Sequence, residues 1–99
     1  MDTFKKIDPK LEVMPKLYSQ DGNTNPTAYL HFFNPLGRGD WYATEMRKEG
    51  DDVLFFGYVK SPIGEDCDEW GYFTLNQLKD TKIIELDLWF EPTPIKEVI

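Results

Sequence analysis

Hydrophobic and polar positions alternate with a period of two along three aromatic-rich runs in the middle of the chain. The runs cover residues 28–33, 41–46 and 53–59. Such alternation is typical of strands, and the short polar connections between the runs contain glycine and suit antiparallel hairpins. The third run is apolar on both faces, which predicts a central strand in which Gly57 allows a bulge or the close packing of a neighbour.

Helical signals lie on either side of these runs. Asp8 and Pro9 fit an N-cap and first helical position, and the spacing of the next apolar residues predicts one short helix that Pro15 limits. Residues 19–27 are rich in Asp, Gly, Asn and Pro and predict an exposed loop.

A second helix is predicted after a short fourth strand at residues 70–73. Thr74 is its candidate N-cap and Gln77 stands at the third helical position, as in a capping box, while Phe73 and Leu78 are placed for a hydrophobic staple. Residues 84–90 then alternate again, which predicts a fifth strand that ends before Pro92.

Together these elements predict one α+β domain over residues 1–99, with an antiparallel meander of about five strands and one or two short helices on one face. A chain of 99 residues is long enough for one small core. Residues 1–10 and 95–99 are candidates for fraying, and the tail either frays or forms a last turn.

Five sequence blocks carry a resemblance to a known family. They are Leu17–Gln20, Trp41–Glu45, Phe55–Val59, Gly71–Leu75 followed by Leu78, and Phe90–Pro94. In order and spacing they resemble an uncharacterised bacterial domain-of-unknown-function family over roughly residues 11–97. The resemblance implies a short acidic protein of plasmids, phages and integrative elements. It implies no activity and no catalytic residues.

Charge is distributed unevenly along the chain. Eighteen acidic residues against eleven basic ones give a net charge of −7, and the whole excess lies in residues 51–99. This charge repels a phosphate backbone and an anionic membrane, so neither nucleic acid nor a membrane is the expected partner. Cys67 is the single cysteine, and no apolar leader follows Met1. We therefore expect a reducing, cytoplasmic location.

The acidic residues of the second half, together with two tryptophans, form the candidate partner-binding set. Its members are Asp51, Asp52, Glu65, Asp66, Asp68, Glu69, Trp70, Glu85, Asp87 and Trp89. If the 48–52 turn and the 61–69 loop lie at neighbouring ends of the meander, these carboxylates form one negative surface. A tryptophan rimmed by carboxylates can anchor an Arg- or Lys-rich partner. The alternative is that the carboxylates belong to solvated loops that keep the protein soluble.

Catalytic and metal chemistry have little support in the sequence. His31 is the one histidine and lies within a strand, and Cys67 sits among carboxylates that disfavour its thiolate. Asp66 and Asp68 alternate, but the segment lacks the ligand order of a calcium loop. No phosphate-binding or dinucleotide glycine motif is present. We expect no cofactor, no metal and no catalytic residue.

The favoured hypothesis is a non-enzymatic, mobile-element-type protein whose acidic surface engages a basic protein. One form of it is a DNA-mimic-like inhibitor of a host nucleic-acid-handling or defence enzyme. One alternative is a small enzyme acting on a nucleotide or peptide, which needs a pocket holding His31, Glu45 or a perturbed tyrosine. Another is an accessory subunit that oligomerises through an apolar patch that involves exposed aromatics or the tail residues Ile95, Val98 and Ile99.

Overall fold

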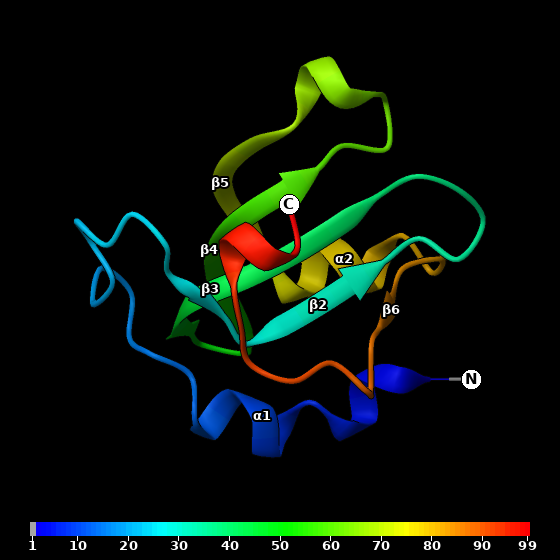
Figure 1. Cartoon of the computed structure of the whole chain (residues 1–99). Helices are drawn as coiled ribbons and strands as arrows, with labels where there is room; N and C mark the ends of the chain where they lie inside the picture. The colour runs from blue at the N-terminus through cyan, green and yellow to red at the C-terminus, as the bar shows by residue number, and fades with distance from the viewer. Residues whose placement is uncertain (1) are drawn as a thin grey trace.

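A five-stranded antiparallel sheet organises the computed structural model, which describes residues 2–99 (Figure 1). Its strands are β2 (Leu30–Phe33), β3 (Asp40–Glu49), β4 (Asp52–Lys60), β5 (Glu69–Thr74) and β6 (Glu85–Leu86), in the spatial order β5-β4-β3-β2-β6. Strands β2 to β5 follow one another as hairpins, which confirms the predicted meander. The chain is an α+β protein.

The remaining elements are short. They are the helices α1 (Asp8–Glu12) and α2 (Leu75–Asp80), the 3-10 turns η1 (Thr3–Lys6), η2 (Glu65–Cys67) and η3 (Ile95–Glu97), and the two-stranded pair of β1 (Thr27–Ala28) with β7 (Thr93–Pro94). The helices α1 and α2 contribute buried residues to the same core face of the sheet (Figure 1).

The predicted start of α2 is confirmed at atomic detail. The Thr74 hydroxyl accepts a hydrogen bond from the Gln77 backbone N–H at 3.1 Å, and the Gln77 side chain accepts from the Thr74 N–H at 2.9 Å. This reciprocal pair satisfies two amides that a helix terminus otherwise leaves free. The start of α1 differs from the prediction: Ile7 is the N-cap, so Asp8 and Pro9 each lie one position further into the helix.

The two faces of the sheet bury different side chains. The core face carries Phe32, Phe55 and Phe73, which pack together and against the helices. The opposite face, which we call the outer face, carries Tyr42 and Tyr58. The carboxyl-terminal tail crosses in front of it (Figure 1), and there Ile95 is buried to 1% exposure.

Both ends of the described chain pack against the sheet. Ile95–Glu97 forms the last turn, which was one of the two expectations for the tail. At the other end the buried Thr3 hydroxyl accepts a hydrogen bond from the Leu86 N–H at 2.8 Å. Because that amide belongs to the border strand β6, η1 closes one border of the sheet. The other border strand, β5, has no strand beyond it.

Gly57 is required by close packing against β3. A Cβ atom at this position would lie 1.8 Å from the Tyr42 carbonyl oxygen. The bulge itself lies in β3, where the register shifts between Ala43 and Glu45. The irregularity leaves both Thr44 and Glu45 buried.

The predicted fifth strand over 84–90 is wrong in length. The Asp87 carboxylate accepts a hydrogen bond from the Trp89 N–H at 3.0 Å, and the Phe90 N–H reaches back to the Asp87 carbonyl. This local turn competes with strand pairing and ends β6 at Leu86. The run 28–33 is likewise divided at Tyr29 into β1 and β2.

Candidate functional site

The candidate acidic residues do not form one continuous surface. Asp51 lies in the turn before β4 and Asp52 begins that strand, whereas the 61–69 loop follows β4. Nine residues of extended strand separate these two places by roughly 30 Å. The expectation that the two loops are neighbours is therefore wrong, because successive connections of a meander lie at opposite ends of the sheet.

Two of the candidate carboxylates have structural partners. Asp52 accepts hydrogen bonds from the Val53 N–H at 2.7 Å and the Asn76 N–H at 2.9 Å, and so joins the β3–β4 turn to α2. Asp68 forms an ion pair with Arg38 and accepts from the Ser61 N–H. The hydrogen bond from Arg38 holds the pKa of the Asp68 carboxyl below its ordinary value. These contacts fix loops and leave little charge for a partner.

Asp87 is part of a cluster centred on His31. Its carboxylate lies 2.9 Å from the histidine Nδ1, and the Asp40 carboxylate lies 2.7 Å from Nε2. The imidazole ring stacks on Tyr42 at 4.6 Å between centroids. Burial, and then the negative charges of Asp40 and Asp87, raise the pKa of Tyr42 to about 12. Both imidazole nitrogens are therefore engaged, and the Tyr42 hydroxyl keeps its proton at neutral pH.

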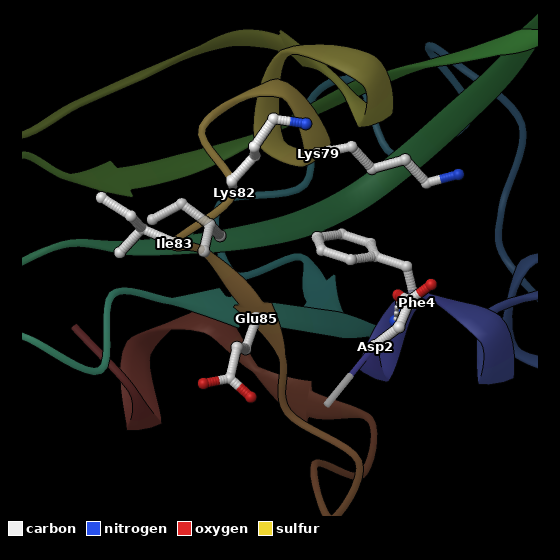
Figure 2. Close-up of a pocket in the computed structure, with 7 residues that line it drawn as sticks. Asp2, Phe4, Lys79, Lys82, Ile83 and Glu85 are labelled. Carbon is white, nitrogen blue, oxygen red and sulfur yellow. Dashed lines mark hydrogen bonds between the residues drawn. The ribbon is translucent and has the colours of Figure 1, made fainter.

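Glu85 lies at the sheet border furthest from β5, in a cleft of about 480 Å³ (Figure 2). Lys79 and Lys82 line the same cleft from the end of α2, and Asp2 and Phe4 enter it from the amino-terminal turn. Charges of both signs thus share this cleft, and Glu85 does not extend an acidic surface.

Trp89 does not share a strand face with Glu85 and Asp87, because β6 ends before it. Its side chain is 91% exposed in the segment between β6 and β7.

Glu65, Asp66 and Glu69 lie in η2 and at the start of β5, in the segment that leads into the exposed Trp70. Within residues 2–99, ion pairs form on His31, Arg38 and Arg47, and none of them includes these three carboxylates. Glu69 and Trp70 are consecutive in β5, so their side chains point to opposite faces of the sheet: Glu69 pairs with Val59 on the core side and Trp70 with Tyr58 on the outer face. Asp51 and Glu85 of the predicted set likewise form no ion pair among residues 2–99.

Trp70 belongs to a set of aromatic side chains on the outer face that we call the aromatic strip, made of Phe56, Trp70 and Tyr72. The Trp70 ring stacks on Phe56 at 5.8 Å and 16°, and Tyr72 lies 5.1 Å from Phe56. Trp70 is 39% exposed and Tyr72 55% exposed. The strip therefore presents aromatic surface to solvent on the outer face.

A cleft of about 400 Å³ opens beside the strip, and we call it the Trp70 cleft. Phe56, Trp70, Thr44 and Glu45 line it from the sheet, and the loop of residues 20–26 lines it from the other side. The Glu45 side chain accepts hydrogen bonds from the Tyr18 N–H at 2.8 Å and the Gln20 N–H at 2.5 Å. The bulge in β3 thus places a buried carboxylate under a polar loop.

The sequence predicts Glu45 only as a candidate group for an enzyme pocket and residues 19–27 only as an exposed loop. The available signal was a charged residue within an apolar strand, because burial of such a residue requires hydrogen-bonding partners. Its partners lie 25 and 27 positions away, which pattern alone does not reveal.

In the part of the chain from residue 2 onward, no group of three or more His, Cys, Asp or Glu side chains is arranged to hold a metal ion. Across the same residues, no helix has the length and apolar character needed to cross a membrane.

The family of the chain follows from comparison with family models. A model described as a protein of unknown function, DUF2958, matches residues 7–95. The chain belongs to this family. No curated protein and no solved structure matches it.

Proposed function

We propose that this chain is a non-enzymatic binding protein that engages a basic protein partner through the aromatic strip, with Glu65, Asp66 and Glu69 adding negative charge in the segment that leads into β5. The observation that carries the proposal is the exposure of Trp70 and Tyr72 on the outer face, preceded in the chain by three carboxylates that form no ion pair among residues 2–99. Exposed aromatic rings flanked by carboxylates suit lysine and arginine side chains, through cation–π contact and ion pairing.

The net charge of −7 supports the same class of partner. It steers basic proteins toward the molecule and repels nucleic acid and anionic membranes. A DNA-mimic-like inhibitor of a host nucleic-acid-handling or defence enzyme, acting in the cytoplasm and encoded on a mobile element, is the specific form of this proposal. The resemblance to a mobile-element family supports that setting.

The enzymatic alternative has weaker support. His31 has both ring nitrogens hydrogen-bonded to carboxylates, so neither is free to transfer a proton to a substrate. Each carboxylate oxygen of Glu45 accepts a backbone amide, which gives this residue a structural role. These groups are engaged in holding segments together.

Site-specific photocrosslinking tests the proposal. A variant with a photoreactive residue at position 72 would be mixed with bacterial lysate and irradiated. The crosslinked proteins would be identified by mass spectrometry and then produced in pure form for binding measurements. We expect a protein with a basic surface whose binding weakens at least tenfold in the triple variant E65Q/D66N/E69Q and in Trp70→Ala. The matched controls are Asp51→Asn and Trp89→Ala, which remove a carboxylate and a tryptophan elsewhere. Equal loss in the controls, or unchanged binding in the test variants, would overturn the proposal.

A further inference from the structure

We infer that the Trp70 cleft is a pocket for one arginine side chain of the partner. The inference rests on the proposed function and deepens it, because it names the group that anchors the partner. It is carried by the contents of the cleft, where a buried carboxylate, two aromatic rings and a polar loop meet.

The electrostatics of the cleft favour a cation. Glu45 is 2% exposed, and its two oxygens accept backbone amides, the bonding pattern of an ionised carboxylate. Among the described residues no basic side chain pairs with it, since its neighbour in sequence Arg47 pairs with Glu49 at 2.8 Å. A buried carboxylate without a counter-ion is costly, and a carboxylate that has used two acceptor positions still offers others. Asp21 adds a second carboxylate to the lining.

The walls of the cleft favour a guanidinium over other cations. Trp70 and Phe56 present ring surface to the cleft. A planar guanidinium stacks on aromatic rings and can bind a carboxylate with two hydrogen bonds, whereas an ammonium is a strongly hydrated point charge. A nucleotide has a planar base as well, but its phosphate would meet Glu45 and Asp21.

The loop side of the cleft is already held in position. The Gln20 side chain donates to the Thr44 carbonyl at 2.8 Å and the Thr27 carbonyl at 3.2 Å, and it accepts from the Thr27 N–H at 3.0 Å. Asn25 accepts from the Lys96 N–H at 3.0 Å, which connects the loop to the tail. A preformed wall reduces the entropy lost when a side chain enters the cleft. The volume of about 400 Å³ lies in the range of small-ligand pockets.

Amide chemical shifts of the folded protein test the pocket with three defined probes: N-acetylarginine amide, N-acetyllysine amide and N-acetylcitrulline amide. We expect the arginine probe to shift the signals of Thr44, Glu45 and Phe56 and the Trp70 indole. We expect binding at least threefold tighter than for lysine and no saturable binding of citrulline, which has the arginine shape without its charge. Trp70→Ala and Asp21→Asn should weaken the arginine probe at least threefold, and Trp89→Ala and Asp51→Asn should not.

Each contrary outcome has a separate meaning. Equal binding of arginine and citrulline would overturn the guanidinium assignment, as would shifts confined to residues 65–69. Those results leave the proposed function standing if the partner still requires the aromatic strip. If the arginine probe fills the cleft but Trp70→Ala and E65Q/D66N/E69Q leave partner binding intact, the proposed function fails and the pocket remains.

Discussion

The Nδ1 atom of His31 lies 2.9 Å from the carboxylate of Asp87, and this contact joins β2 to the turn that follows β6. The same carboxylate group accepts from the Trp89 N–H and thereby holds the turn. We expect Asp87→Ala to lower the free energy of unfolding by about 1–3 kcal/mol, because it leaves a half-buried imidazole nitrogen without its partner. Urea denaturation measures this. Asp51→Ala, at an exposed turn, should change the value by less than about 0.5 kcal/mol; equal effects would contradict a structural role for the pair.

Gly57 provides a prediction with a matched control. Gly57→Ala should lower the free energy of unfolding by about 3 kcal/mol or more, because the new Cβ would collide with the Tyr42 carbonyl oxygen. Gly71→Ala, in the neighbouring strand, should fold normally, since nothing lies within 4 Å of the added Cβ. Thermal unfolding followed by circular dichroism compares the two. A Gly57→Ala variant as stable as Gly71→Ala would show that β3 and β4 are further apart than described.

Tyr42 should give the protein a specific alkaline sensitivity. The folded protein holds the Tyr42 proton more tightly than the unfolded chain does, because the pKa is raised from 10.0 to about 12. This contribution to stability, about 1–2 kcal/mol after allowance for solvent screening, is complete below pH 10 and is lost as the pH rises through 12. Phenolate absorbance should show a tyrosine that titrates late, absent from Tyr42→Phe and from the protein in urea. A single titration near pH 10 would contradict the burial of this hydroxyl.

The Asp68–Arg38 pair should give a contribution to stability that is lost as the pH falls, whereas the contribution of Tyr42 is lost as the pH rises. The pKa of Asp68 is lowered from 3.8 in the folded state, so its contribution is present above that pH and is lost as the pH falls through the lower folded value. We expect Asp68→Asn to increase amide hydrogen exchange in residues 61–68 at neutral pH. Once the pH falls below the lowered pKa of Asp68, the variant and the unchanged protein should converge. Protection that is identical at neutral pH would show that the pair does not hold the loop.

The strands and the second helix could be predicted because their signals are local. Period-two alternation and the reciprocal bonds of Thr74 and Gln77 act over a few residues, and the structure contains both. The end of β6 was missed because the Asp87 side chain forms a turn that overrides an alternating pattern.

The candidate site was harder to predict because its chemistry depends on distant partners. Asp68 pairs with Arg38 across 30 positions, and Glu45 binds the amides of Tyr18 and Gln20 across 27 and 25 positions. The positions of acidic residues in the sequence do not distinguish a carboxylate that holds a loop in place from one that has no ion-pair partner. The opposite placement of Asp51 and Glu65, in contrast, follows from the meander topology itself, since β4 runs between them.

The hydrogen bond from Leu86 to the Thr3 hydroxyl has a consequence for self-assembly. With that border covered, β5 is the exposed border at which another strand can add. Edge-to-edge pairing of two β5 strands would therefore leave neither molecule with an exposed border for a third. Loss of the amino-terminal turn would expose a second border for strand addition in every molecule, which is the condition for edge-to-edge growth into fibres.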